Sequence, residues 1–303
     1  MKNIFVIIYL FAFSLSSFGT EFLQISDLGT SAKMIALGNI EGFDCSAASV
    51  FENPAGLHRI QNISVAYFHT SLLKNALPYN SVAVAYKGSF GTFAFGYMGV
   101  EDTNIFLTNK TAGVVGITDT AKYANQIFKL GWQTVLWPRS YIGLNLSYFN
   151  HKIIQDELEG NGFNTDIGYF WEDKASAFSL CAKNVVPFFK IHYSNNKEEA
   201  LPVQVVASGS KSWNDFRFFS QIKIQSLNVG YLKAIGIEYR PYFLGMLSIA
   251  FGWKEINIEQ DIFNNFTMGM SLNLNSFGIS IAYENAQYFE QDNLFFISAY
   301  FNL

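Results

Sequence analysis

A period of two runs through the chain from about residue 62 onward and constrains its fold more than any other feature. Runs of eight to eleven residues alternate large apolar side chains with small or polar ones. Within Ser81–Lys87, for example, Val82, Val84 and Tyr86 occupy every second position. Successive side chains of a strand point to opposite faces, whereas a helix repeats every 3.6 residues. The alternation therefore predicts β-strands with one large apolar face.

Fourteen such runs are expected. They lie near residues 62–70, 80–87, 91–100, 125–135, 141–152, 162–171, 177–185, 202–210, 216–226, 231–239, 244–254, 264–274, 277–284 and 293–302. The connections alternate in length, as long external loops and short periplasmic turns do in an outer-membrane barrel. The loops are expected near 71–79, 101–124, 153–161, 186–201, 227–230, 255–263 and 285–292, and only 227–230 is as short as a turn. Residues 62–303 are therefore predicted to form an antiparallel, 14-stranded transmembrane β-barrel.

Composition supports a membrane location. The chain is 50% hydrophobic, 17% aromatic and only 15% charged, whereas a soluble domain is about 25% charged. No internal window offers the roughly 18 apolar residues that a transmembrane helix needs. A sheet in hydrocarbon must close on itself, because no water is there to pair its free edges. A soluble sandwich or solenoid remains the alternative fold.

The two ends carry targeting patterns. Residues 1–19 are typical of a signal peptide, with Lys2, an apolar stretch over Ile4–Phe13, and small residues suited to cleavage. The final alternating run, which ends at Leu303, is interpreted as a signal to the barrel-assembly machinery. The predicted location is the bacterial outer membrane, in contact with its lipid. Cys45 and Cys181 are the only cysteines, and a bridge or two separate thiols both remain open.

Residues 20–61 lack the alternation. Thr30–Gly38 has the caps of a short helix, and it is followed by Asp44-Cys45-Ser46-Ala47-Ala48 and by Asn53-Pro54-Ala55-Gly56-Leu57. On its own, Asn53-Pro54 is an ordinary turn. Together, these features resemble the N-terminal hatch of the FadL/PorV group of outer-membrane proteins. Their hatch motif corresponds here to Asn53, Pro54, Ala55 and Gly56.

That resemblance implies fourteen strands and passive uptake of a hydrophobic, long-chain fatty-acid-like molecule through a lumen that the hatch plugs. It also implies exit through a lateral gap near a kinked third strand. The glycines that could form the kink are Gly91, Gly96 and Gly99, since glycine weakens a strand ladder. An alternative role for them is close packing of the wall against the hatch. The external loops are shorter than those of the fatty-acid transporters.

A transporter of this kind needs an apolar external groove. Its candidate lining is Phe106, Leu107, Val114 and Val115 of loop 101–124, with Phe188 and Phe189 of loop 186–201. Two other functions remain open. One is a PorV-like structural or shuttle component for exported proteins, and the other is a general porin.

Catalysis and cofactor binding have little support in the sequence. His58, His69, His151 and His192 lack metal-ligand spacing, and no Gly-x-Ser-x-Gly elbow occurs. We therefore expect no enzyme activity, no metal and no cofactor. The formal net charge of −4 gives no basic surface for nucleic acid. Trp132, Trp137, Trp171, Trp213 and Trp253 lie near strand ends, where aromatic girdles anchor barrels.

Overall fold

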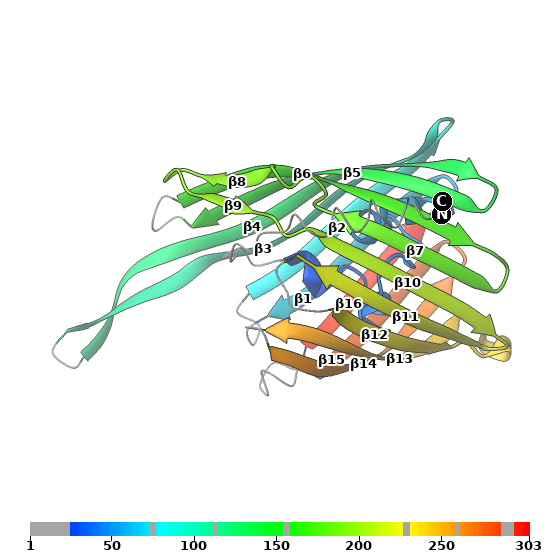
Figure 1. The fold of residues 1–303 in the computed structure, drawn as a ribbon. Helices are drawn as coiled ribbons and strands as arrows, with labels where there is room; N and C mark the ends of the chain where they lie inside the picture. Colours follow the sequence, from blue (N-terminus) through cyan, green and yellow to red (C-terminus); the bar gives the residue numbers. More distant parts are fainter. Residues whose placement is uncertain are drawn as a thin grey trace.

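The computed structural model describes residues 25–72, 77–111, 114–153, 158–226, 231–258, 261–285 and 294–303 (Figure 1). Fourteen of its strands form a closed ring in which every neighbouring pair is antiparallel, and β5 pairs with β6 to complete the ring. The predicted all-β, 14-stranded antiparallel barrel is confirmed. The predicted signal peptide lies outside the described residues.

The fourteen barrel strands follow the chain order. They are β1 (Ile63–Leu72), β2 (Leu77–Gly88), β3 (Gly91–Thr111), β4 (Val114–Trp137), β5 (Ser140–Ile153), β6 (Leu158–Glu172), β7 (Ser176–Lys183), β10 (Gln204–Trp213), β11 (Phe216–Gln225), β12 (Tyr231–Tyr239), β13 (Leu247–Ile258), β14 (Asp261–Leu274), β15 (Phe277–Asn285) and β16 (Leu294–Asn302).

The alternation works as the sequence predicts. In β1, Val65 and Tyr67 point outward and are 40% and 46% exposed, while Ser64 and Ala66 point inward and are buried. Outward positions are large and apolar around the ring, as a wall facing hydrocarbon requires. The barrel has a turn end, with connections at 89–90, 138–139, 173–175, 214–215, 240–246 and 275–276, and an opposite loop end. The connection at 240–246 contains the short helix η4 (Tyr242–Leu244).

Several segments predicted as loops contain strands instead; in the expected loop 255–263, for example, β13 covers 255–258 and β14 covers 261–263. β3 and β4 continue as one hairpin through the expected loop 101–124, with pairs from Asp102↔Tyr123 to Thr111↔Val114 (Figure 1). Two strands that extend beyond the closed ring can continue as a hairpin, because each still pairs its backbone with the other. The expected loop 186–201 contains a second hairpin of β8 (Lys190–Tyr193) and β9 (Glu198–Ala200), which pairs with β6. The strands were predicted to be only as long as is needed to cross a bilayer, and this prediction was wrong for these segments.

The segment Ile25–Ile60, called here the N-terminal segment, lies inside the barrel (Figure 1). It contains η1 (Ile25–Leu28), α2 (Ala32–Ala36), α3 (Ser49–Glu52) and η2 (Pro54–Arg59). The predicted short helix is present as α2. Gly38, at φ 87°, ends it in the left-handed conformation that favours glycine. The helices α3 and η2 were not predicted.

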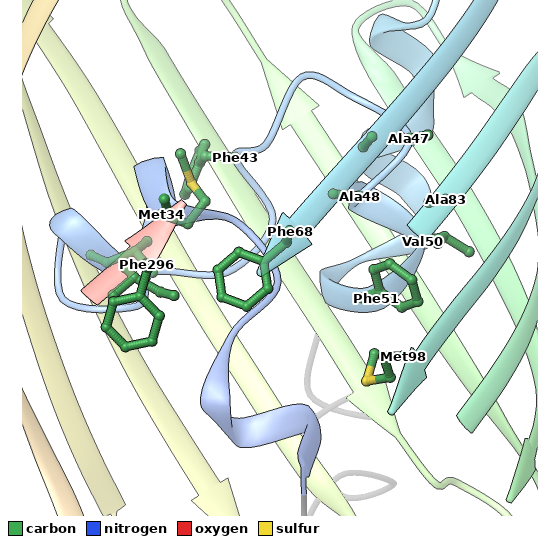
Figure 2. Packing of buried hydrophobic residues seen from close by; sticks show 14 of the residues in the cluster. Met34, Phe43, Ala47, Ala48, Val50, Phe51, Phe68, Ala83, Met98 and Phe296 are labelled. Atoms are coloured by element: carbon green, nitrogen blue, oxygen red, sulfur yellow. The ribbon is translucent and has the colours of Figure 1, made fainter. Parts of the chain in front are cut away.

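The hydrophobic core lies between this segment and the inner wall. Figure 2 shows Phe51 beside Met98, and Phe68 beside Phe296, whose ring centroids are 6.0 Å apart. Small residues on the wall leave space for the apolar side chains of the segment. The segment therefore fills the lumen, and its contacts with the wall form the hydrophobic core. Among the described residues, every helix is too short or too polar to cross a membrane.

Candidate functional site

Asn53 joins the N-terminal segment to the wall. Its side-chain amide donates to the Ser179 hydroxyl at 2.8 Å and to the Tyr169 carbonyl at 3.1 Å, while its oxygen accepts from the backbone of Ala55 at 2.9 Å. Asn53 is extended at φ −144° and precedes Pro54 at the first position of η2, the arrangement of an N-cap followed by proline. The motif is therefore both a local cap and a bond to β6 and β7.

Glycines in the wall let this motif approach the strands. A Cβ atom on Gly143 would lie 2.4 Å from the backbone nitrogen of Ala55, and one on Gly168 would lie closer still to the Asn53 side-chain oxygen. Side chains at these wall positions would push η2 away. Asn145 of β5 adds a hydrogen bond of 2.7 Å to the carbonyl of Val50 in α3. The second half of the N-terminal segment is thus held by polar contacts to β5, β6 and β7.

A buried ion cluster holds the middle of the segment. The Glu41 carboxylate forms salt bridges with Lys183 of β7 and with Lys223 of β11, the latter at 2.6 Å, and Lys223 also lies 3.0 Å from Asp27. The backbone nitrogen of Glu41 donates to the Gln221 side chain at 2.7 Å. Burial opposes ionisation of Glu41, but the two ammonium groups lower its pKa to about 2. Glu41 is therefore charged at neutral pH and tied to two strands of the wall.

Glu52 of α3 stands in a contrasting environment. Its carboxyl group accepts a hydrogen bond of 2.8 Å from the backbone of Gly42 and forms none of the salt bridges found among the described residues. Burial raises its pKa well above the usual value, and the nearby carboxylate of Asp44 raises it further. Burial therefore shifts the pKa of Glu52 upward, whereas the salt bridges of Glu41 in the same segment shift its pKa downward.

At the turn end, η2 binds Glu172 of β6. His58 Nε2 lies 2.8 Å from one carboxylate oxygen and Arg59 lies 3.3 Å from the other. The His58 ring stacks on Tyr141 with centroids 3.8 Å apart, and its Nδ1 lies 2.8 Å from the carbonyl of Ala55. Both ring nitrogens of His58 thus have protein partners, so His58 acts here as a structural contact.

The remaining histidines are dispersed. His69 contacts Asn80 at 2.8 Å, His151 contacts the Tyr193 hydroxyl at 3.2 Å, and His192 lies 3.3 Å from Glu198. Within the described ranges, no group of three or more His, Cys, Asp or Glu residues could hold a metal ion. Cys45 and Cys181 are both free, so the two thiols are separate.

The α2 end of the segment lies against a different part of the wall. A Cβ atom on Gly252 of β13 would come within 2.1 Å of the backbone nitrogen of Gly38. That nitrogen donates to the Thr267 hydroxyl at 3.0 Å, and Lys33 lies 3.2 Å from Glu238. The backbone after α2 therefore packs directly on the backbone of the wall. The hydrogen bond and the salt bridge add polar contacts, and together they join α2 to β12–β15.

The three glycines singled out as a kink lie in different settings. Gly91 is the first residue of β3, directly after the turn at 89–90, and has a φ of 127°. Gly96 and Gly99 lie in ladders that run without a register shift from Thr92 to Asp102 on the β4 side. A Cβ atom on Gly96 would lie 2.5 Å from the Phe51 ring. The described pairing thus has no bulge at Gly96 or Gly99, and Gly96 makes the close packing proposed as its alternative role. The lateral opening stays a prediction.

The predicted external lining is only partly described. Phe106 and Leu107 lie in β3, opposite Thr120 and Asp119 of β4, so their assignment to a loop was wrong. Val114 and Val115 begin β4, and the side chains of all four lie outside the described ones. Phe188 and Phe189 precede β8 with ring centroids 5.1 Å apart, and Phe188 is 74% exposed. The structure does not bring the two groups together among the described side chains, and the external groove stays a prediction.

Sequence reasoning missed an apolar inner wall at the loop-end half of the lumen. Its members are large, inward-facing and buried: Phe68, Tyr79, Met98, Val100, Ile127, Phe149 and Phe296. A signal for it was available in β3, where the inward positions change from Thr92, Ala94 and Gly96 to Met98 and Val100. The change from small to large marks where the wall itself supplies large apolar side chains to the core, with Met98 beside Phe51 of α3.

Comparisons with known proteins show a shared fold. No family model matches the chain, and no curated protein matches it. The fold is similar to that of the toluene transporter TodX of P. putida, with a TM-score of 0.65 at 9% identity, over 91% of this chain and 99% of that one. It is similar also to the CymD monoaromatic hydrocarbon channel, with a TM-score of 0.62 at 10% identity, over 91% of this chain and 98% of that one. The chain therefore has the complete barrel architecture of solved hydrocarbon channels.

Proposed function

We propose that this protein is an outer-membrane channel of the FadL/PorV type that takes up hydrophobic molecules, with the N-terminal segment as its hatch. The apolar inner wall is the observation that carries the proposal. Its side chains, such as Phe68, Met98 and Phe149, are large and buried inside a closed barrel, where a lumen for ions would be polar. An apolar solute gains free energy when it leaves water for such a surface.

Most of the buried cations in the lumen are paired with carboxylates, which favours an uncharged molecule, while Arg217 of β11 binds the Ser210 hydroxyl. Lys129 is paired with Asp166 at 2.5 Å, and Lys254 with Glu284 at 2.8 Å. Lys183 and Lys223 share Glu41, as described above. A carboxylate passing through would need a cation that is not already neutralised, because a buried unpaired charge is costly. The substrate class we favour is therefore a hydrocarbon or a protonated fatty acid.

Both halves of the N-terminal segment are attached to the wall, so a hatch that opens must break polar bonds as well as packing contacts. The α3–η2 half is bonded to the wall by Asn53 and by the pairing of His58 and Arg59 with Glu172. The α2 half combines close packing, with Gly38 against Gly252, with the hydrogen bond to Thr267 and the salt bridge between Lys33 and Glu238. The exit route that we propose is a lateral opening at the third strand, near Gly96.

Uptake into liposomes tests the proposal. Liposomes that contain the protein should accumulate labelled toluene and a labelled long-chain fatty acid faster than empty liposomes. The variant Met98→Gln places a polar amide of similar size on the apolar inner wall and should slow uptake, whereas Asn161→Gln at the exposed loop end should not. Uptake by the wild type at the rate of empty liposomes would contradict the proposal. Equal uptake by a variant without residues 20–60 would contradict the hatch.

A PorV-like structural or shuttle role has one observation in its favour. The β2–β3 pairing ends at Tyr79↔Val100 and the β4–β5 pairing begins at Tyr123↔Ile153, so the rest of the β3–β4 hairpin pairs only with itself in the described ladders. Unpaired strand edges can accept another chain. A variant with this hairpin shortened should keep uptake if the channel function is correct, and should lose only partner binding if the shuttle role is correct. A general porin has no comparable support.

A further inference from the structure

A groove of about 670 Å³ crosses the outer wall over β13–β16 and β1. One side is a row of outward side chains in direct register, Ile249↔Met270↔Ile281↔Ile297. The other side is the next outward row, Phe251↔Met268↔Tyr283↔Phe295. Its floor between the rows includes Gly269 and Ala282, which are paired with each other and turn inward. The groove therefore runs across the strands, between two apolar ridges.

The groove is polar at one end only. It ends at His69 and Ser71 in the last third of β1 toward the loop end. There, His69 Nδ1 lies 2.8 Å from the Asn80 oxygen, and the Tyr67 hydroxyl donates to the same oxygen at 3.0 Å. These groups face outward on a wall whose other outward residues are mainly apolar. An occupant that matches this pattern has one polar end and a single long apolar part.

The dimensions fit half a bilayer. From Ile249 to His69 the groove crosses four inter-strand steps of about 4.8 Å, which is roughly 19 Å. Strands of membrane barrels tilt by about 45°, so a line across them descends by about 13 Å along the membrane normal. A single leaflet has a hydrocarbon depth of about 15 Å, half of the 30 Å core. The groove therefore spans the depth of one leaflet, beginning toward the loop end.

We propose that this groove binds one acyl chain of a membrane lipid, with the lipid's polar head beside His69, Ser71 and Asn80. The wall faces hydrocarbon, so an acyl chain is the matching apolar occupant, and the polar end gives it a fixed direction. Bulk lipid exchanges freely along a smooth wall. An acyl chain that lies between two ridges contacts protein atoms on both sides, and these contacts replace those it would make with neighbouring lipids. The site is separate from the lumen and does not depend on the proposed transport.

Lipid retention tests the site. Purified protein is mixed with dipalmitoyl phosphatidylethanolamine in detergent, and bound lipids are counted by native mass spectrometry. The variant Ile281→Trp fills the groove and should retain one lipid fewer, with affinity for that lipid weakened by about tenfold. The control Ile222→Trp places the same ring on β11, outside the groove, where Ile222 is also outward and 48% exposed, and should match the wild type.

Further measurements separate the other outcomes. The single-chain lysophosphatidylethanolamine should compete for the same lipid, because only one chain enters the groove. His69→Leu should weaken retention of both lipids while leaving the groove open. If Ile281→Trp does not fold, as judged by its heat-dependent gel mobility, Ile297→Trp on the same ridge replaces it. Equal retention by the wild type, the groove variant and the control would overturn the proposal. So would a wild-type dimer that the groove variant converts to a monomer.

Discussion

The side-chain amide of Asn53 donates to the hydroxyl of Ser179, 126 residues further along the chain, at 2.8 Å. Both groups are buried, and this bond connects the start of η2 to β7 in the interior of the barrel. A bond of this kind contributes little when it is intact, but breaking it leaves a buried polar group without a partner. The bonds of Asn53 therefore stabilise the attachment of the segment to the wall.

Replacement of Asn53 by alanine should unseat η2. The change Asn53→Ala removes the cap on Ala55 and the amide bonds to β6 and β7 together, so we expect the free energy of unfolding to fall by about 2 kcal/mol or more. Denaturant unfolding in detergent, followed by tryptophan fluorescence, measures the loss. Asn161→Ala is the control, because Asn161 is exposed and its side chain only accepts the Tyr148 hydroxyl. Equal stability of the two variants would show that the Asn53 bonds are unimportant.

The Glu41 cluster predicts a stability that depends on acid. The pKa of Glu41 is about 2 in the folded protein, against an ordinary value of 4.5. A carboxyl group with a depressed pKa stabilises the fold above its ordinary value, and this contribution is lost as the pH falls from about 5 toward 2. In Glu41→Gln the decline over that range should be shallower. The variant should also be less stable at pH 7, by roughly 3 kcal/mol, because two buried lysines lose their partner.

An exposed pair gives the matched comparison. Lys152 and Glu159 lie 2.6 Å apart at the loop end, with side chains 37% and 54% exposed. Water and salt screen such a pair, so Glu159→Gln should leave stability unchanged at every pH. A pH profile of Glu41→Gln that overlays that of Glu159→Gln would show that burial of the Glu41 cluster does not matter.

Local patterns in the sequence were enough to predict the strands of the barrel wall. They were not enough to predict the contacts inside the barrel. Lipid demands an apolar outward face at every second position, so alternation such as Val82, Val84 and Tyr86 identified each of the fourteen barrel strands. Gly38 after an apolar run likewise indicated the end of α2. Both signals come from constraints that act within about ten residues.

The lumen contacts depend on the closure of the ring. Glu41 pairs with Lys183, which is 142 residues away, because the register of every strand between them sets which inward positions face each other. A sequence pattern shows whether a side chain points inward or outward. It does not show the position of the residue along the barrel axis or around the ring. For the same reason, Phe106 and Leu107 were assigned to a loop. Nothing in local alternation states where the membrane ends and the β3–β4 hairpin continues.

Glu52 predicts the opposite pH dependence to Glu41. Its pKa is raised in the folded protein by burial and by Asp44, with Glu41 adding to the effect and Lys183 and the Gly42 bond opposing it. As the pH rises above the ordinary value of 4.5, the unfolded chain ionises more readily than the folded chain, so this group lowers stability as the pH rises. Glu52→Gln keeps the acceptor for Gly42 and removes that penalty.

Glu52→Gln should therefore gain stability over the wild type as the pH is raised from 5 to 8. Infrared spectroscopy of the wild type should also show a protonated carboxyl band that the variant lacks. Glu101→Gln is the control, since Glu101 is exposed at the loop-end rim. A constant difference in stability between Glu52→Gln and the wild type across that range would mean that folding does not raise the pKa of Glu52.

The contact between Gly252 and Gly38 predicts how tightly α2 is seated. A methyl group on Gly252 would lie 2.1 Å from the backbone nitrogen of Gly38 and 2.3 Å from the carbonyl carbon of Leu37, and backbone cannot rotate away as a side chain does. Gly252→Ala should therefore displace α2 and lower the free energy of unfolding by about 2 kcal/mol, the usual cost of overpacking. Limited proteolysis should then cut the N-terminal segment while the barrel stays intact.

In Gly209→Ala, where the nearest atom to the new methyl is 3.8 Å away, both readouts should match the wild type, because the strand has room for the added group. If Gly252→Ala behaves as Gly209→Ala does, the α2 half of the segment is not held by its fit to the wall, and the buried polar bonds of Asn53 and Glu41 must hold the whole segment.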